Sequence, residues 1–508
     1  MSDDMSDDVV IIGGGPNGLL LAVELALAGV RPTVLEQYAE RPSILKANGL
    51  VGRVVRAMDY RGLLERLGGG PRPVRMPGFQ FGAVPLELSD LDDHELYALP
   101  IPQLRLEKIL AERAAELGVT IHKGHTLLSV AQDDEHVTAE VDGPRGKYTL
   151  TTRYLVGADG GRSTVRKQLG IDFPGITDDT FVGRSGQVAI AAPVATGDGV
   201  LEVPGLGRLR PQTFTRTDTG LFAFGNFQPG RYRVSVLEWG QEPLPDNEDM
   251  PLEELRAAAK RVLGADLPMS EPADAPAGLR RLTGINSRQA AHYRRGRVFL
   301  AGDAAHVHSG MGGPGLNLGM QDVLNLGWKL AGAVRGWAPA GLLDTYESER
   351  HPVGRRVIMQ TRAQMALTVP DPNVTALREL MTELFADKHT RQHVADLMAG
   401  TDVRYATTDD HPLSGRLMPD LALGGGTRVA ELLRRARPLL LDLGGAPGGA
   451  AGWADRVDTV TTTARSSLAA ALVRPDGYVA WASDGGTAGL ADALRTWFGE
   501  PQSRSRTA

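Results

Sequence analysis

A short glycine-rich segment near the N-terminus, IIGGGPNG, places the strongest constraint on the fold of this chain. It follows the apolar β-branched run VVII and precedes LLLAVELALAGV, whose Ala and Leu content favours a helix. The segment PTVLE at 32–36 then has the character of a second strand that ends in an acidic residue. A strand, a glycine turn, a helix and a second strand within roughly 30 residues form the βαβ unit that binds dinucleotides.

Three glycines of this segment, Gly13, Gly15 and Gly18, have GxGxxG spacing. In such a unit the first glycine permits the turn out of the strand, the second lets the backbone approach a pyrophosphate, and the third lets helix and strand pack closely. The helix N-terminus offers free N–H groups to the phosphates. Glu36, at the end of the second strand, can accept hydrogen bonds from a ribose diol. The spacing predicts a dinucleotide site, but it does not distinguish NAD from FAD.

Length and composition exclude several other classes of protein. A chain of 508 residues predicts two or three domains, and a net charge of -6 gives no electrostatic reason to bind nucleic acid or an anionic membrane. The chain has no cysteine, so disulfides, thiolate nucleophiles and cysteine-ligated metals are excluded. No apolar run is long enough to span a bilayer, and the acidic start MSDDMSDD is unlike a secretory signal. A cytoplasmic location is therefore expected.

Two further glycine-rich segments carry an acidic residue. LVGADGGRS at 155–163 surrounds Asp159 with glycines; taken alone, it fits an ordinary tight turn as well as a binding site. RVFLAGDAAHVHSGMGGPGLNLGMQD at 297–322 runs from a strand through a turn at Asp303 to a second helix N-terminus. Asp303 can bind a polyol hydroxyl, and that helix N-terminus can stabilise negative charge on a ring that takes up electrons. A reduced flavin carries such charge, so these segments favour FAD over NAD.

The three motifs, in this order, resemble those of the p-hydroxybenzoate-hydroxylase-like FAD-dependent aromatic monooxygenases. That family has GxGxxG near the N-terminus, a DG motif in mid-chain, here GADGGRSTVRK at 157–167, and a GD motif further on, here AGDAAH at 301–306. The resemblance covers about the first 400 residues. The remainder resembles the thioredoxin-like appendage of the branch that acts on aromatic polyketides, although without cysteine it cannot perform thiol–disulfide exchange.

The resemblance implies roles for individual residues. Gly15, Pro16 and Asn17 are expected at the FAD pyrophosphate, Glu36 at the adenosine ribose, and Asp159 where the backbone runs close to a bulky ligand. The remaining expected FAD contacts are Gly13, Gly18, Gln37, Lys46, Gln103, Leu128, Asp303, Gly313, Gly315, Leu316 and Asn317.

Other assignments leave alternatives open. Arg53 could stabilise an oxygenated flavin or a substrate anion as a catalytic residue, or form a plain salt bridge, and Arg162 could bind NADPH phosphate or face solvent. His306 and His308 follow the GD turn; we expect hydrogen bonding there rather than metal binding, and no metal site is predicted. Many family members have a proline where this chain has Gly310, which leaves the orientation of the substrate open.

The predicted fold is α/β, with a Rossmann-like FAD-binding domain, an inserted antiparallel-sheet substrate domain and a C-terminal thioredoxin-like domain. The expected ranges are 1–180 and 281–400 for the FAD-binding domain, 181–280 for the substrate domain and 411–500 for the C-terminal domain. Phe222, Phe224 and Trp239 are candidate substrate contacts, with sheet core as the alternative.

The resemblance also implies an activity. NADPH would reduce tightly bound, non-covalent FAD, and O₂ would then form a flavin C4a-hydroperoxide that hydroxylates a polycyclic phenolic substrate. The alternatives are Baeyer–Villiger oxygen insertion on the same scaffold, a flavin dehydrogenase, or a non-catalytic binding module. Assembly into homo-oligomers stays open.

Overall fold

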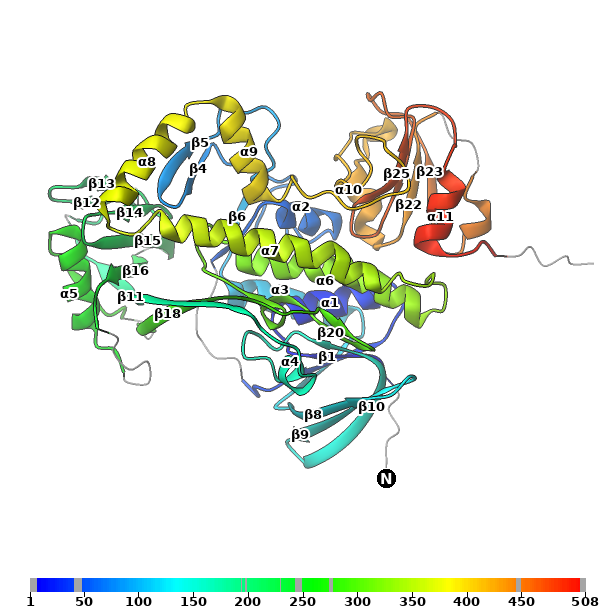
Figure 1. Ribbon diagram of the computed structural model, residues 1–508, viewed down its shortest axis with the longest axis horizontal. Helices are drawn as coiled ribbons and strands as arrows, with labels where there is room; N and C mark the ends of the chain where they lie inside the picture. Colours follow the sequence, from blue (N-terminus) through cyan, green and yellow to red (C-terminus); the bar gives the residue numbers. More distant parts are fainter. Residues whose placement is uncertain are drawn as a thin grey trace, which may run out of the picture.

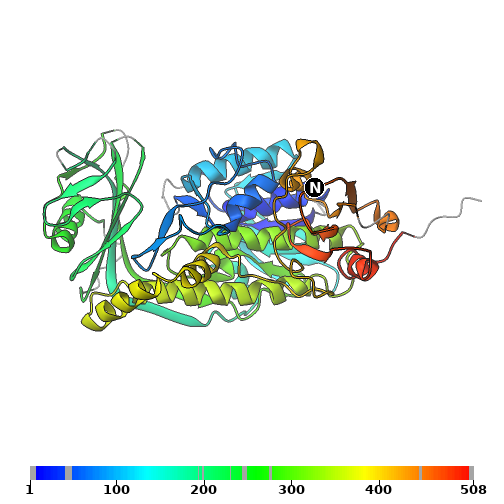
Figure 2. The ribbon, with the colours of Figure 1, turned by 90° about the horizontal axis from the view of Figure 1, so that it is seen from above.

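The computed structural model describes residues 7–40, 48–192, 194–196, 199–228, 230–242, 249–273, 277–444 and 449–502. Three units lie side by side in Figure 1: an antiparallel sheet at one end, a central domain with long helices, and a small α/β domain at the other end. Figure 2 shows the same succession from above. The architecture confirms the predicted fold class.

The central domain is built on an eight-stranded sheet. Its path runs β19 (Arg294–Arg295), β20 (Val298–Leu300), β10 (Gly146–Gly157), β1 (Asp7–Ile12), β2 (Pro32–Glu36) and β7 (Thr120–Lys123), with β8 (Thr126–Gln132) and β9 (Val137–Gly143) extending β10. The pairs β20–β10, β10–β1, β1–β2 and β2–β7 are parallel. The three glycine motifs follow β1, β10 and β20, so neighbouring parallel strands bring them to one edge of the sheet.

Helices complete the central domain. They are α1 (Pro16–Leu27), α2 (Arg53–Tyr60), α3 (Gln103–Glu116), α4 (Thr164–Gln168), α6 (Pro314–Val334), α7 (Asp344–Ala366), α8 (Pro372–Leu384) and α9 (Lys388–Ala399). Within the described residues, no helix is long and apolar enough to cross a membrane.

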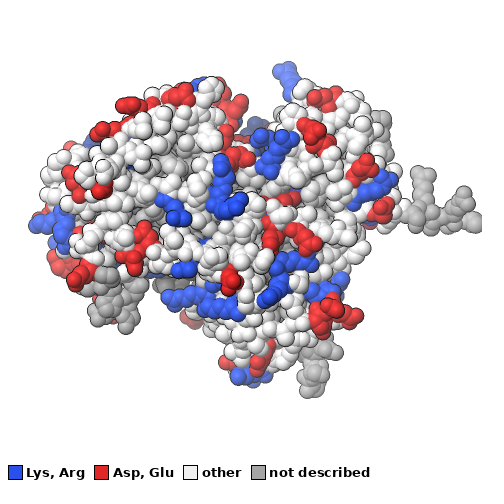
Figure 3. All heavy atoms as spheres, in the orientation of Figure 1, with Lys and Arg blue, Asp and Glu red and all other residues white. Residues whose placement is uncertain are grey.

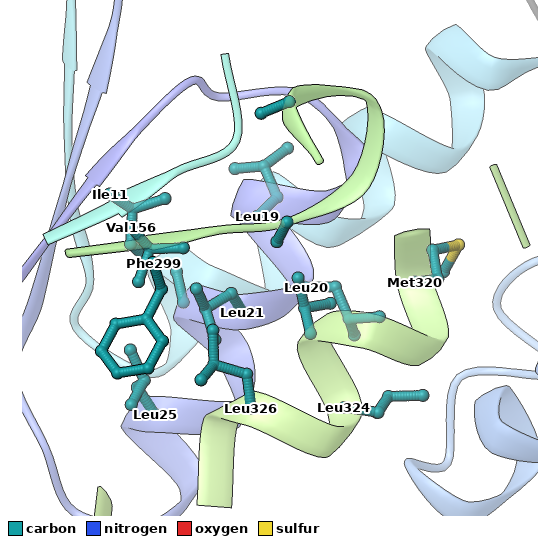
Figure 4. Packing of buried hydrophobic residues seen from close by; sticks show 14 of the residues in the cluster. Ile11, Leu19, Leu20, Leu21, Leu25, Val156, Phe299, Met320, Leu324 and Leu326 are labelled. Carbon is teal, nitrogen blue, oxygen red and sulfur yellow. The ribbon is translucent and has the colours of Figure 1, made fainter. Parts of the chain in front are cut away.

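The core of the central domain lies between the sheet and its helices. Figure 4 shows Ile11, Val156 and Phe299, from three neighbouring strands, against leucines of α1 and α6. These side chains are buried because α1 and α6 are apolar along the faces that they present to the sheet. Burial of such side chains from both helices holds the helix N-termini at fixed positions above the strand ends.

The second sheet has seven strands. It contains β14 (Phe214–Arg216), β15 (Gly220–Gln228), β16 (Arg231–Trp239), β11 (Gly175–Ile190), β18 (Arg280–Gln289), β21 (His306–Val307) and β17 (Met269–Ser270), and α5 (Leu252–Leu263) covers one face. Short pairs flank it: β12 (Leu201–Val203) with β13 (Gly207–Leu209), β3 (Gly49–Val51) with β6 (Ala98–Pro100), and β4 (Gly78–Phe81) with β5 (Val84–Glu87). Strands β11 and β18 extend beyond the predicted range 181–280 at both ends.

The C-terminal domain has a four-stranded mixed sheet in the order β23 (Asp458–Thr461), β22 (Leu439–Asp442), β24 (Ala470–Val473) and β25 (Val479–Ser483), with α10 (Val429–Leu432) and α11 (Leu490–Phe498). Buried ion pairs attach it to the central domain. Arg474 donates to both carboxylate oxygens of Glu349 on α7, at 2.6 and 2.9 Å. Arg428 donates to Asp59 on α2, at 2.9 Å.

Candidate functional site

The first glycine motif forms the turn for which its spacing is suited. Gly13 has a φ of +110°, and a Cβ there would lie 2.4 Å from the carbonyl oxygen of Ala158. A Cβ on Gly18 would lie 2.0 Å from the carbonyl oxygen of Gly13, so only glycine lets α1 pack this closely. A Cβ on Gly15 would meet no atom within 4 Å, which leaves open space beside the backbone at the start of α1.

Glu36 is held at the edge of this turn by two backbone N–H groups. Gly14 donates to one of its carboxylate oxygens at 2.8 Å, and Tyr38 donates to the other at 2.9 Å. The carboxylate therefore has a fixed orientation at the end of β2, as a hydrogen-bond acceptor for a diol requires.

Asp159, in the DG motif, has two differently placed oxygens. One accepts hydrogen bonds from the N–H groups of Thr164 and Val165 at 2.7 and 3.1 Å, which orders the start of α4. The other is buried and has no partner among the described residues. Burial raises the pKa of Asp159 above its ordinary value, against the hydrogen bonds that lower it.

The GD motif leads from β20 into the N-terminus of α6. The helix begins after Gly313, which has a φ of +72°, and no side chain caps its first N–H groups. Asn317 accepts a hydrogen bond from the N–H of Val51 at 2.9 Å and donates to the carbonyl of Gly313, so its side chain ties this helix end to β3. The uncapped N–H groups of α6 remain available to a ligand.

One cavity of about 1620 Å³ connects the three motifs with the antiparallel sheet. This volume exceeds the roughly 300–1,000 Å³ typical of a site for one small ligand. The predicted site residues that line it are Gly13, Gly15, Pro16, Asn17, Glu36, Gln37, Gln103, Asp159, Asp303, Gly313, Gly315, Leu316 and Phe224.

Several predicted site residues do not line this cavity. Gly18 is enclosed in the turn, and the side chain of Asn317 is engaged with β3. Leu127 lines the cavity and Leu128 does not; Leu128 lies at an irregularity in the pairing of β8 with β9, between Leu127 and Ser129. Lys46 lies outside the described residues.

Arg53, the candidate catalytic residue, also lies elsewhere. Its side chain is 7% exposed, and its Nε lies 3.3 Å from a carboxylate oxygen of Glu95. It borders a small cavity beside Arg350 and Asp476, at the contact with the C-terminal domain, and not the large cavity. The ion pair with Glu95 matches the salt-bridge alternative, and Nη1 of Arg53 is buried without a hydrogen-bond partner among the described residues.

Two buried polar atoms without hydrogen-bond partners indicate that the cavity fits FAD. Asn17 Oδ1 and Asp159 Oδ1 are both buried, and neither has a hydrogen-bond partner among the described residues. A buried unpaired oxygen costs about 1–3 kcal/mol, so a ligand that donates to these oxygens would stabilise the site. The uncapped N-termini of α1 and α6 supply N–H donors at the same cavity.

The two histidines after the GD turn have different surroundings. His306 is fully buried, and its Nε2 lies 2.6 Å from Asp322, which also accepts a hydrogen bond from Arg350 at 2.8 Å. His308 lines the cavity, and its Nδ1–H donates a hydrogen bond to the carbonyl oxygen of Ser309 at 2.8 Å, because a carbonyl can only accept. Burial lowers the pKa of His308 to about 4. Among the described residues, no three His, Asp or Glu side chains are grouped so that they could hold a metal.

The predicted aromatic contacts mostly belong to the core of the sheet domain. Phe222 and Phe224 pack on the face of β15 that α5 covers, and Phe224 also borders the cavity. Trp239 packs against Phe181, with ring centroids 5.7 Å apart, and does not line the cavity. Alternation explains the position of Phe222, which lies on the α5 side of β15. Trp239 lies on the same face of β16 as Arg233 and Ser235, but it packs in a separate apolar cluster with Phe181 and Met311.

The cavity-facing residues that sequence reasoning missed are Ala223, Gly225, Arg233 and Ser235. The first half of RYRVSVLEW carries the signal, since Arg231, Arg233 and Ser235 at every second position indicate a face that is not core there. The same face becomes apolar at Leu237 and Trp239. On the face that Figure 3 shows, basic and acidic side chains are interspersed.

Comparison with known families matches two models to this chain. One, described as an FAD binding domain, matches residues 6–361. The other, described as the C-terminal domain of aromatic-ring hydroxylases, matches residues 411–501.

Curated relatives match almost the full length of the chain. A 12-dehydrotetracycline 5-monooxygenase/anhydrotetracycline 6-monooxygenase from Streptomyces rimosus is 44% identical over 98% of this chain and 100% of that protein. The solved structure of the anhydrotetracycline hydroxylase from Streptomyces rimosus superposes with a TM-score of 0.85 at 42% identity, over 98% of this chain and 100% of that one.

Two other relatives carry names that describe different reactions. A rifampicin monooxygenase from Streptomyces venezuelae is 41% identical over 97% of this chain and 98% of its own length. A dialkyldecalin synthase from Streptomyces rugosporus is 37% identical over 97% of this chain and 99% of its own length. The name of the second relative describes a synthase and not a monooxygenase.

Proposed function

This chain belongs to the family of FAD-dependent aromatic-ring monooxygenases, and from that premise we propose that it hydroxylates a polycyclic phenolic substrate of the polyketide type with NADPH and O₂. The observation that carries the proposal is the single cavity, which extends from the three FAD motifs to the polar face of the antiparallel sheet. Such a cavity can place a second ligand beside the cofactor. We further propose that the enzyme is cytoplasmic. The proposal applies equally to a monomer and to a homo-oligomer.

The overall reaction balances as a monooxygenation. One O₂ and one NADPH, with a proton, give one hydroxylated product, one water and NADP⁺. When bound, FAD accepts a hydride from NADPH and transfers one oxygen atom to the substrate. The residues of this chain bind and orient the two ligands and exclude water from the space between them.

Particular residues have proposed tasks in this scheme. Glu36 would accept hydrogen bonds from the adenosine ribose, and the backbone at Gly15 would approach the pyrophosphate. The N-terminus of α6, at Gly315 and Leu316, would stabilise negative charge on the reduced flavin ring. Gly310 borders the cavity, and a Cβ there would meet no atom within 4 Å, so this position leaves space for a bulky substrate.

The first test is turnover under ¹⁸O₂. The purified holoenzyme is mixed with NADPH and a panel of polycyclic phenols that includes anhydrotetracycline, and products are analysed by mass spectrometry and NMR. We expect one product with one ¹⁸O atom on an aromatic carbon. NADPH oxidation that yields only hydrogen peroxide with every phenol would contradict the proposal.

Two rival functions give different products in the same experiment. Baeyer–Villiger insertion would give the same gain in mass but an ester or lactone in the NMR spectrum. A synthase reaction, of the kind for which the dialkyldecalin synthase is named, would give a product without a gain of oxygen. The second rival has a specific basis, because a relative with that name matches almost the full length of this chain.

A further inference from the structure

The register of β15 and β16 defines the face of the sheet that borders the cavity. Ala223 lies opposite Ser235, and Gly225 lies opposite Arg233. All four line the cavity, whereas the alternate residues of both strands pack against α5. Three of the four are small, so Arg233 is the one long side chain of this group.

Arg233 has no hydrogen-bond or ion-pair partner among the described residues, although its side chain is half-buried. Burial and the charge of Arg280 lower its pKa below the ordinary value for arginine, and no acidic group offsets them. Other arginines of the same sheet are paired: Arg184 lies 2.7 Å from Glu238, and Arg281 lies 2.5 Å from Glu254.

A partly buried guanidinium without an anionic partner is unfavourable unless a ligand supplies a negative charge beside it. The guanidinium is a planar donor fork, and it suits an anionic oxygen, or two adjacent oxygens, better than a neutral group. Arg233 lies on the sheet side of the cavity, where the sheet faces the space next to the FAD motifs.

We propose that Arg233 is a specificity-determining residue that binds an anionic oxygen of the polycyclic substrate, an ionised phenol or enol. The inference rests on the proposed function and adds the ionisation state of the substrate to it. Ionisation makes the ring more electron-rich, which favours attack on an electrophilic oxygen atom. The guanidinium of Arg233 would also orient the substrate, because it would hold the edge of the ring system that carries the ionised oxygen.

The test compares two probes of equal size in binding to the oxidised holoenzyme: anthraquinone-2-carboxylate, which is anionic, and anthraquinone-2-carboxamide, which is neutral. Binding is followed through the change in flavin absorbance, with no NADPH present. We expect the wild type to bind the carboxylate at least about tenfold more tightly. Arg233→Met should abolish this preference, and Arg233→Lys should retain part of it.

Arg256→Met is the control, because it removes the same charge from α5, which covers the same sheet, at an exposed residue that does not line the cavity. It should preserve the preference of the wild type within about twofold. If Arg233→Met fails to retain FAD, Arg233→Gln and the lysine variant supply the comparison.

Three outcomes would overturn the inference. They are equal binding of both probes by the wild type, no binding of the carboxylate at millimolar concentration, and an unchanged preference in Arg233→Met. A raised KM for NADPH in Arg233→Met, with the preference intact, would instead assign this cation to the NADPH phosphate. The binding experiment does not require turnover, so its result can be interpreted even if the ¹⁸O₂ experiment fails.

Discussion

The side chain of Asn17 occupies the space that a Cβ on Gly302 would need: its Nδ2 would lie 2.0 Å from such an atom. Asn17 belongs to the GxGxxG motif and Gly302 to the GD motif, so this contact joins two segments that are far apart in the sequence. Two features therefore favour glycine at position 302. A side chain there would prevent the two motifs from packing together, and the backbone has a left-handed φ of +62°.

Gly302→Ala is expected to destabilise the protein and to reduce its FAD content. Left-handed backbone costs a non-glycine residue about 1–2 kcal/mol, and displacement of Asn17 adds to this cost. The measurement is the thermal midpoint together with the flavin-to-protein ratio. In an Asn17→Ala background, where the nearest remaining side-chain atom is 3.6 Å away, Gly302→Ala should cost only the backbone part. Equal costs in both backgrounds would show that Asn17 is not the cause.

Asp159→Asn is expected to weaken FAD binding by about tenfold or more while the protein still folds. The amide retains an oxygen for the N–H groups of Thr164 and Val165, but it replaces a carboxylate oxygen that has no partner with an NH₂ group. Isothermal titration of the flavin-free protein with FAD measures the effect. Asp133→Asn is the control, since Asp133 also accepts two backbone N–H groups but lies in an exposed turn. Similar FAD affinities of the two variants would contradict a role of Asp159 at the cofactor.

Much of the fold follows from local patterns in the sequence. The βαβ unit, the three glycine motifs and the C-terminal domain are all visible as apolar strands followed by turn residues. Strands β8 and β9 form a hairpin whose turn is closed by the side chain of Asp133, which accepts the N–H groups of Glu135 and His136. Asp is a residue typical of such turns. The turn residues that border the cavity also follow apolar strands, so their positions were predictable from the sequence.

Which of two open alternatives a residue follows depends on contacts that no local pattern reveals. Arg53 forms an ion pair with Glu95, which is 42 residues away in the sequence. Phe222 faces α5 because that helix covers one side of β15. Which side of a strand is covered depends on the tertiary fold, so a list of aromatic residues cannot distinguish core from pocket. The polar alternation of β16 was the better guide to Arg233.

Arg474→Met is expected to destabilise the contact between the C-terminal and central domains. Both carboxylate oxygens of Glu349 accept hydrogen bonds from Arg474, and both side chains are almost fully buried. Arg474 also pairs with Asp476, and Glu349 keeps Lys329 at 2.7 Å, so the variant leaves two buried carboxylates with one cation. Removing one partner of a buried ion pair costs about 3–5 kcal/mol. Thermal unfolding with a probe in each domain measures the effect. Arg495→Met, at an exposed pair with Asp492 in the same domain, should cost at most about 1 kcal/mol. Equal midpoints for the two variants would show that this ion pair does not hold the domains together.

His308 is expected to make the stability of the protein fall in mild acid. Burial lowers the pKa of His308 from its ordinary 6.5 to about 4, so the folded protein keeps this imidazole neutral where the unfolded chain binds a proton. The stability from this residue is complete above pH 6.5 and decreases as the pH falls toward 4, by about 3 kcal/mol at most. Urea unfolding at several pH values in this range measures the slope. His308→Gln should reduce the slope, whereas His292→Gln, at a residue whose side chain is 67% exposed, should leave most of it. A slope that is the same in wild type and His308→Gln would assign the acid sensitivity to other groups.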